Sequence, residues 1–219
     1  MRIEVLVDVK TTLGEGPLWD VEEQRHYWID SFYGRVFRCT ADGREVRAWD
    51  VPQKIGSMCL RRGGGAVVSL ARGWHFLDLK TGEVELIHDP EPNRPNNRIN
   101  DGKVDRRGRF IAGSMDTMED GPNGALYRLD HDLSLHKLDD KIVVSNGPCW
   151  SPDSKTFYFA DTWANKIWAY DPQGVWGGYW NSHPGAYHGS RDWYFVEGYT
   201  ASPFINSQYA ESPDYYFVG

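Results

Sequence analysis

A repeated glycine motif constrains the fold of this 219-residue chain more than any other feature. Four segments place a glycine directly after a residue that varies: EGPLWD, IGSMCL, DGKVDR and NGPCWS. Their glycines are Gly16, Gly56, Gly102 and Gly147, which stand 40, 46 and 45 residues apart. A period of about 40–50 residues with only strand-like content is typical of a β-propeller, in which each repeat forms one four-stranded blade.

The sequence between the glycines agrees with this interpretation. Each repeat holds three or four short runs of β-branched and aromatic residues, separated by Gly, Asp and Asn. Examples are HYWID and GRVFRC in the first repeat and AVVSL and EVELIHD in the second. No segment shows the 3.6-residue apolar period of an amphipathic helix over a useful length. We therefore predict an all-β fold of the propeller type, with a β-sandwich as the alternative, since a sandwich does not need so regular a period.

The residues that precede the four glycines are the candidate functional residues: Glu15, Ile55, Asp101 and Asn146. The innermost strand of each blade lines the central channel, so equivalent positions should converge on the axis. Three of the four carry side-chain oxygens, and Asn100 precedes Asp101. Asn-Gly and Asp-Gly pairs also favour hairpin turns, which is the alternative for each pair taken alone. Glutamate is not a turn former, and hairpin turns need not recur at blade spacing.

Carboxylate and amide oxygens at one end of a channel are the ligands that a hard cation such as Ca²⁺ or Mg²⁺ prefers. None of the seven histidines stands in an H-E-x-x-H pair or beside these residues, so a zinc site is the weaker alternative. We expect Gly147 to let the chain approach the axis, with Asn146 offering its amide oxygen to the cation. Cys149 and Trp150 are expected to pack within the blade.

Several longer segments, in order and at blade spacing, resemble the SMP-30/gluconolactonase/luciferin-regenerating-enzyme family, also called regucalcin-like. They are LGEGPLWD, NRINDGKVDRRGRFIAGSM, GALYRLD and SNGPCWSPDSKTFYFADTWANKIWAYD. The resemblance covers residues 1–171. It implies a six-bladed propeller, of which this chain supplies about four blades, with one divalent cation in the channel and hydrolysis of sugar lactones as the activity.

The resemblance also assigns roles to individual residues. Glu15 and Asn146 match metal ligands, Arg98 and Asn100 match residues that hold the substrate, and Asp101 matches the neighbouring acid. The cation, expected to be Ca²⁺ with Zn²⁺, Mg²⁺ or Mn²⁺ as alternatives, would polarise the lactone carbonyl and acidify a water, whose proton a carboxylate accepts. Arg98 would stabilise developing negative charge or orient the sugar acid.

The segment EPNRPNNR, which leads to Arg98, is predicted to be a long functional loop at the channel mouth. A solvated loop charge is the alternative role for Arg98.

The chain departs from the family where the third metal ligand, an Asp that is also the expected base, should lie about 50 residues after Asn146. Position 196 is Val196, and Glu197 of the Glu197-Gly198 pair is the predicted stand-in.

The composition changes near Pro172. Residues 172–219 hold 13 of the 31 Phe, Trp and Tyr residues, one Arg and no Lys. We therefore predict two regions: propeller blades over 1–171, and an atypical aromatic- and Gly-rich segment over 172–219. The second is a divergent fifth blade, a grafted segment or a non-native tail.

The function predicted from the sequence is metal-dependent hydrolysis of a sugar lactone. The alternatives are a non-catalytic propeller that binds a divalent cation or a sugar acid, and an inactive fragment of a lactonase. Incomplete closure would leave unpaired blade edges, through which self-association is expected.

Charge and hydropathy narrow the partners and the location. A net charge of −7 without a basic face argues against nucleic acid and anionic membranes as partners. No stretch approaches the roughly 18 apolar residues of a membrane span, and the N-terminus lacks a signal-like apolar core. Three cysteines far apart in the sequence fit a reducing compartment, so a cytoplasmic location is expected.

Overall fold

A computed structural model describes residues 3–170 together with the backbone of residues 176–181. These residues form four antiparallel sheets of four strands each, and we call the sheets blades 1 to 4 in chain order. Blade 1 consists of β1 (Gly14–Asp20), β2 (Arg25–Asp30), β3 (Arg35–Thr40) and β4 (Arg47–Asp50). Blade 2 consists of β5 (Ile55–Leu60), β6 (Ala66–Leu70), β7 (Gly73–Leu77) and β8 (Val84–His88). Blade 3 consists of β9 (Asn97–Val104), β10 (Phe110–Asp116), β11 (Gly124–Leu129) and β12 (Leu135–Ile142). Blade 4 consists of β13 (Ser145–Trp150), β14 (Phe157–Asp161), β15 (Lys166–Tyr170) and β16 (Trp176–Asn181).

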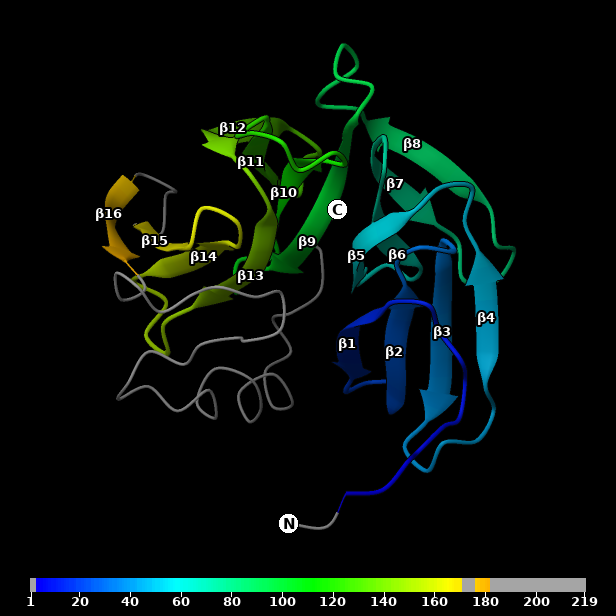
Figure 1. Ribbon diagram of the computed structural model, residues 1–219. Helices are drawn as coiled ribbons and strands as arrows, with labels where there is room; N and C mark the ends of the chain where they lie inside the picture. Colours follow the sequence, from blue (N-terminus) through cyan, green and yellow to red (C-terminus); the bar gives the residue numbers. More distant parts are fainter. Residues whose placement is uncertain (1–2, 171–175, 182–219) are drawn as a thin grey trace.

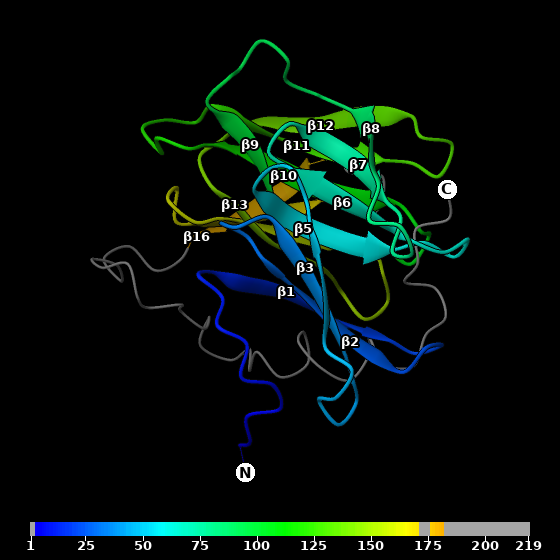
Figure 2. The same ribbon diagram turned by 90° about the vertical axis from the view of Figure 1, so that its right-hand side faces the viewer.

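The blades are arranged around a common axis. Figure 1 shows them as a fan, with the first strand of each blade, β1, β5, β9 and β13, on the inner side. In Figure 2 the sheets of blades 1, 2 and 3 follow one another face against face. The prediction of an all-β propeller arrangement with about four blades is confirmed. The part of the chain covered by the structure holds no helix that could cross a membrane.

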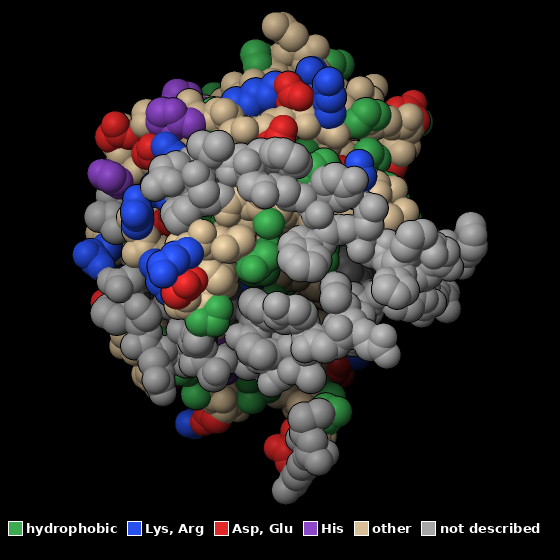
Figure 3. All heavy atoms as spheres, turned by 90° about the vertical axis from the view of Figure 1, so that its left-hand side faces the viewer, with side chains coloured by type: hydrophobic (Ala, Val, Ile, Leu, Met, Phe, Trp, Pro, Cys, Tyr) green, Lys and Arg blue, Asp and Glu red, His purple; other side chains and the backbone are tan. Residues whose placement is uncertain are grey.

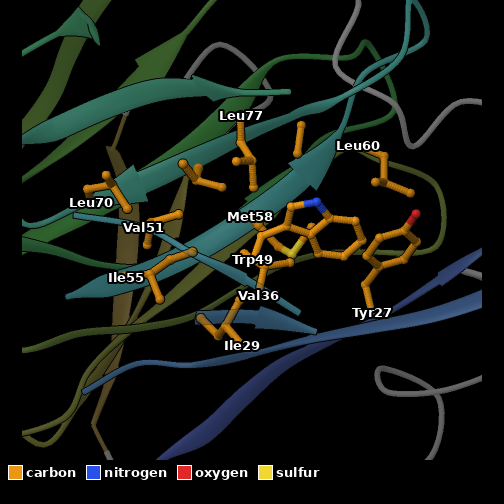
Figure 4. Packing of buried hydrophobic residues seen from close by; sticks show 12 residues of the cluster. Tyr27, Ile29, Val36, Trp49, Val51, Ile55, Met58, Leu60, Leu70 and Leu77 are labelled. Atoms are coloured by element: carbon orange, nitrogen blue, oxygen red, sulfur yellow. The ribbon is translucent and has the colours of Figure 1, made fainter. Parts of the chain in front are cut away.

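Hydrophobic clusters fill the spaces between neighbouring blades. The cluster between blades 1 and 2 joins residues such as Ile29 and Trp49 of blade 1 to Ile55 and Leu70 of blade 2 (Figure 4). A second cluster lies between blades 2 and 3, and a third, which includes Phe157, lies between blades 3 and 4. In blade 2, Met58 and Val68 therefore face blade 1, while Cys59 and Val67 face blade 3, as the period-2 pattern of a strand requires.

The inner strands of blades 2 and 3 approach each other closely at glycine. A Cβ on Gly56 would lie 2.3 Å from the carbonyl oxygen of Asn100, and a Cβ on Gly102 would lie 2.7 Å from the Ser57 hydroxyl. Ser57 Oγ donates a hydrogen bond of 3.1 Å to the carbonyl oxygen of Asn100. Only a residue without a side chain allows the β5 and β9 backbones this proximity.

That Gly147 lets the chain approach the axis stays a prediction. Gly147 has φ +59 and Gly16 has φ +58, a left-handed conformation that glycine adopts without strain. The nearest described atom to a Cβ on Gly147 is the Ala160 Cβ at 3.9 Å, an ordinary contact. Backbone conformation selects glycine in blades 1 and 4, and proximity selects it in blades 2 and 3.

The last described strand lies beyond the predicted boundary at residue 172. β16 pairs antiparallel with β15, so the backbone of residues 176–181 supplies the outer strand of blade 4. The division at residue 172 stays a prediction. All three cysteines are free, and Trp150 packs against Phe157, as expected of a residue inside the blade. Figure 3 shows Lys and Arg side chains interspersed with Asp and Glu over the described part of the blade 4 side.

Candidate functional site

A break in strand register marks the predicted site position in every blade. Each inner strand has a bulge or irregularity against its neighbour next to the glycine motif: between Glu15 and Leu18, Ile55 and Ser57, Ile99 and Gly102, and Asn146 and Cys149. Bulges bend a strand and re-aim a side chain, and they are common beside active sites. Glu15, Ile55 and Asn146 are each the last paired residue before the break, whereas Asp101 lies inside it.

Aspartates anchor the two end blades at this point. Asp30 lies 15 residues after Glu15 and accepts backbone hydrogen bonds of 2.8 and 3.4 Å from the two residues that precede β1. Asp161 lies 15 residues after Asn146 and accepts two bonds of 3.0 Å from the two residues that precede β13. Asp30 also accepts bonds from the turn that follows β2. These carboxylates fix the backbone at the start of β1 and β13, and thereby the positions of Glu15 and Asn146 near the start of each strand.

Side chains of β9 join the inner strands of blades 3 and 4. Asn100 Nδ2 donates 2.7 Å to the carbonyl oxygen of Ser145 and 3.2 Å to Asn146 Oδ1. Asp101 Oδ2 accepts a bond of 2.8 Å from the Gly147 backbone N–H. Asn146 Nδ2 in turn donates 2.8 Å to Thr162 Oγ1, in the loop between β14 and β15. The Asn146 amide is thus held from both sides.

Charged groups of β1 and β9 interact across the blades. Burial raises the pKa of the Glu15 carboxyl, the Asp101 carboxylate raises that pKa further, and Arg98 opposes the rise. Burial also raises the pKa of Asp101, while the Gly147 N–H opposes this. Burial lowers the pKa of the Arg98 guanidinium, against the attraction of Glu15 and Glu119. The site therefore holds two partly buried carboxyl groups that repel each other, next to one arginine.

The donor atoms suit a hard cation in kind and supply part of a coordination shell. Glu15 offers a carboxylate whose pKa is raised, and a cation bound nearby would lower that pKa again by stabilising the ionised form. Asn146 offers an amide oxygen. Ca²⁺ takes six to eight oxygen ligands. Residues 3–170 contain no cluster of three or more His, Cys, Asp and Glu placed to hold a metal ion.

The structure links Asn100 and Asp101 of β9 to Asn146 and Gly147 of β13 by hydrogen bonds, and Glu15 interacts electrostatically with Asp101 and Arg98. Arg98 lies in strand β9, is half-buried and is attracted by the negative charge of Glu15. It is therefore not a freely solvated loop charge. Glu197, the predicted stand-in for the missing acid, lies outside the described residues.

Two residues beside the site were not predicted. Trp163 Nε1 donates 2.5 Å to Glu119 Oε2, and Glu119 interacts electrostatically with Arg98. Trp163 is 40% exposed, a large exposed fraction for a tryptophan, and it follows Thr162, the partner of Asn146. Glu119 follows Asp116 at the end of β10, and Trp163 follows Asp161 at the end of β14. This recurring position, just after the second strand of a blade, could have indicated both residues.

Comparison with known proteins agrees with this architecture. Residues 13–183 match the SMP-30/Gluconolactonase/LRE-like region. The chain is 34% identical over 176 residues to regucalcin of Xenopus laevis, covering 78% of this chain and 59% of that protein. It is 33% identical over 171 residues to L-arabinolactonase of Azospirillum brasilense, covering 76% and 57% of the two chains. The match thus spans less than two thirds of either relative.

Among solved structures, a calcium-binding protein, regucalcin, from Agrobacterium tumefaciens superimposes with a TM-score of 0.74 at 25% identity. The superposition covers 81% of this chain and 61% of that one. With the family match over most of its length and four blades arranged in the same way, the chain belongs to the SMP-30/gluconolactonase/LRE-like family.

Proposed function

We propose that this chain acts as a divalent-cation-dependent hydrolase of a sugar lactone. The observation that carries the proposal is the set of contacts that Asn100 and Asp101 make with Asn146 and Gly147 at the inner strands, where Glu15 interacts electrostatically with Asp101 and Arg98. Paired carboxyl groups and one arginine suit a substrate with a polarised carbonyl and several hydroxyls. A relative named for lactone hydrolysis, the L-arabinolactonase, supports the substrate class.

Each residue has a proposed role. Glu15 and Asn146 would hold the cation, with Ca²⁺ favoured by their oxygen ligands and by the calcium-binding regucalcin among similar structures. A bound cation would supply Lewis-acid polarisation of the lactone carbonyl and would lower the pKa of the attacking water. Arg98 and Asn100 would hold the hydroxyls and the carbonyl oxygen of the sugar.

The reaction needs one base and one proton donor. Water oxygen bonds to the carbonyl carbon, the ring carbon–oxygen bond breaks, and the ring oxygen leaves as a hydroxyl that takes up a proton. A carboxylate accepts the proton lost by the water and can return it to the leaving oxygen. Glu197 stays the proposed base, and Asp101 is the proposed neighbouring acid that keeps the site negatively charged.

Lactone hydrolysis tests the proposal directly. The full chain is mixed with a gluconolactone or an arabinonolactone in weak buffer, and acid release is followed with and without EDTA. We expect a rate above spontaneous hydrolysis that EDTA abolishes and Ca²⁺ restores. A rate equal to buffer alone under all three conditions would remove catalysis for this chain.

A non-catalytic role is the second candidate, because the described residues supply only part of a coordination shell and the match spans 57–59% of its relatives. In that case calorimetry should show Ca²⁺ or gluconate binding without turnover, and Glu15→Ala should weaken Ca²⁺ binding. Absence of both binding and turnover would favour the third alternative, an inactive fragment. The cytoplasmic location and self-association through blade edges stay predictions.

A further inference from the structure

The loop between β8 and β9, residues 89–96, is held by a side chain of blade 2. Arg72, in the turn between β6 and β7, donates from Nη2 to Asp89 Oδ2 at 2.9 Å. The same guanidinium donates to three loop carbonyl oxygens, those of Glu91, Pro92 and Arg94, at 3.4, 3.3 and 3.2 Å. The planar, multiply donating guanidinium thereby fixes the path of the loop backbone.

Glu91 fixes the same loop to blade 3. Its side chain is only 8% exposed. Its Oε1 accepts bonds from the Tyr127 hydroxyl at 2.9 Å and the Ser114 hydroxyl at 3.0 Å, and its Oε2 accepts 2.8 Å from Asn97 Nδ2. Arg94 lies 4.0 Å away. A buried carboxylate is costly unless it is hydrogen-bonded, and here three donors from β9, β10 and β11 compensate it.

This network reaches the candidate site through the start of β9. Asn97, the Glu91 partner, is the first residue of β9 and also donates 2.8 Å to the carbonyl oxygen of Asn123. Arg98 is the next residue and Asn100 follows within the same strand. Since a strand is extended and paired with its neighbour, fixing its first residue fixes where the following side chains start. The loop is therefore a rigid support for the two proposed substrate-holding residues.

We propose that Glu91 and Arg72 are positioning residues, which hold Arg98 and Asn100 in place for a sugar lactone or its sugar acid. This inference rests on the proposed function and deepens it. A site held in its productive geometry before the substrate arrives loses less free energy on binding. Both residues are proposed to act through the loop and β9 and not by contact with the substrate.

The test compares Glu91→Gln, Arg72→Ala and Arg72→Lys in the full chain. For Glu91→Gln and Arg72→Ala we expect KM for the lactone, and Kd for gluconate, to rise by about tenfold, the lower end of what loss of an orienting partner costs. Arg72→Lys keeps the charge and should recover part of the loss. Ca²⁺ affinity should change less than KM, because Asp30 and Asp161 anchor the entries of β1 and β13, and of the two proposed ligands only Asn146 accepts a hydrogen bond from Asn100.

Arg47 offers a matched control. Its Nη2 donates 3.2 Å to the carbonyl oxygen of Lys80, so Arg47→Ala also removes an arginine–carbonyl bond between two blades, far along the chain from Arg98. It should leave KM and gluconate affinity unchanged. Equal KM values in wild type, Glu91→Gln and Arg72→Ala would overturn the positioning role.

Hydrogen–deuterium exchange keeps the inference testable if the proposed function fails. Amides of residues 97–104 should exchange faster in Glu91→Gln and Arg72→Ala than in wild type or Arg47→Ala. If wild type neither binds gluconate nor hydrolyses lactones, the proposed function falls, while faster exchange still supports the positioning of β9. Unchanged exchange across 97–104 would contradict it.

Discussion

The two middle blades and the two end blades come from one repeat, yet their inner strands are buried to different extents. All six residues of β5 and five of the eight in β9 are buried. In β1 only one residue of seven is buried, and in β13 only two of six. The hydrophobic clusters explain the difference, since among the described residues blades 2 and 3 each contribute to two clusters while blades 1 and 4 each contribute to one. Burial of an inner strand thus depends on its neighbours.

The same division separates stability from chemistry. Blade 2 carries the fully buried Ile55 at the site position and Leu70 where the end blades have an anchoring aspartate. The end blades carry Glu15 and Asn146, whose side chains are only half-buried. Blade 3 combines both roles, because Asp101 belongs to the largely buried strand β9 and is also one of the candidate site residues. A polar side chain on an inner strand costs less folding free energy where the neighbouring blade leaves the strand partly exposed to water.

The largest contrast should appear on substituting the site position itself. Glu15→Gln removes the carboxylate proposed to bind the cation. Lactone hydrolysis should fall about a hundredfold or more, since loss of groups that only orient a metal ligand already costs about 10–100-fold. The matched change in blade 2, Ile55→Val, should cost about 1 kcal/mol of stability and leave hydrolysis unchanged. Initial rates with saturating Ca²⁺ and urea unfolding measure the two effects; full activity in Glu15→Gln would contradict the comparison.

Substituting the repeated glycine by alanine should distinguish close backbone approach, which requires glycine in blade 2, from a left-handed backbone, which favours it in blade 4. Gly56→Ala places a Cβ 2.3 Å from a backbone oxygen and should destabilise the chain by about 3 kcal/mol, the upper range for overpacking. Gly147→Ala meets only a left-handed backbone and should cost about 1–2 kcal/mol. Urea unfolding midpoints compare the variants, and a larger loss for Gly147→Ala would show that proximity also operates in blade 4.

The aspartate anchor of blade 1 should make stability depend on pH. Burial would raise the pKa of Asp30, but backbone N–H groups outweigh it and lower that pKa below its ordinary value of 3.8. The ionised carboxylate is therefore favoured in the folded state, and its stabilisation is complete above pH 3.8 and disappears as the pH falls through the lowered folded value.

Asp30→Asn should accordingly cost about 1–2 kcal/mol at pH 7 and progressively less below pH 4. Leu70→Met, at the equivalent position of blade 2, should show a cost that does not vary with pH, because no titrating group is exchanged. Urea unfolding of both variants at pH 7 and at pH 3 provides the measurement. A constant cost for Asp30→Asn would rule out the charged anchor.

The smallest effect is expected at Trp163. Trp163→Phe removes the indole N–H that donates a hydrogen bond to the Glu119 carboxylate and leaves an aromatic ring in place. One lost hydrogen bond of about 1 kcal/mol corresponds to a rise of about fivefold in KM for the lactone. Trp49→Phe is the control, because Trp49 donates to the Leu79 carbonyl oxygen between blades 1 and 2; it should cost stability and leave KM as in wild type. An unchanged KM in Trp163→Phe would exclude Trp163 from the site.

The fold was predictable from the sequence because it follows a period. The same period singled out Glu15, Asp101 and Asn146; Glu15 and Asn146 are the last paired residues before their breaks, and the functional roles of all three stay predictions. The resemblance to a family supplied Arg98 and Asn100. The bulges were not predicted, since one extra residue in the inner strand leaves little trace in a single sequence.

Contacts that cross blades without a period escaped prediction. Glu91 lies in the Pro- and Asn-rich segment that was predicted to be a functional loop, but nothing in that segment indicates its donors, which lie 6, 23 and 36 residues away along the chain. Glu119 and Trp163 meet across 44 residues. Such pairs depend on how two blades pack, a tertiary effect that local patterns do not encode.

The constant interval of 15 residues between a site residue and its anchor has a consequence for how such proteins diversify. Glu15 with Asp30 and Asn146 with Asp161 each lie within one hairpin, so each hairpin carries both a chemical group and the means to place it. The composition of the channel can then change one hairpin at a time without a shift in strand register elsewhere. Each hairpin can therefore vary as a separate unit. In blade 2 the same interval separates Ile55 from Leu70, two apolar residues that provide neither a polar site residue nor a carboxylate anchor.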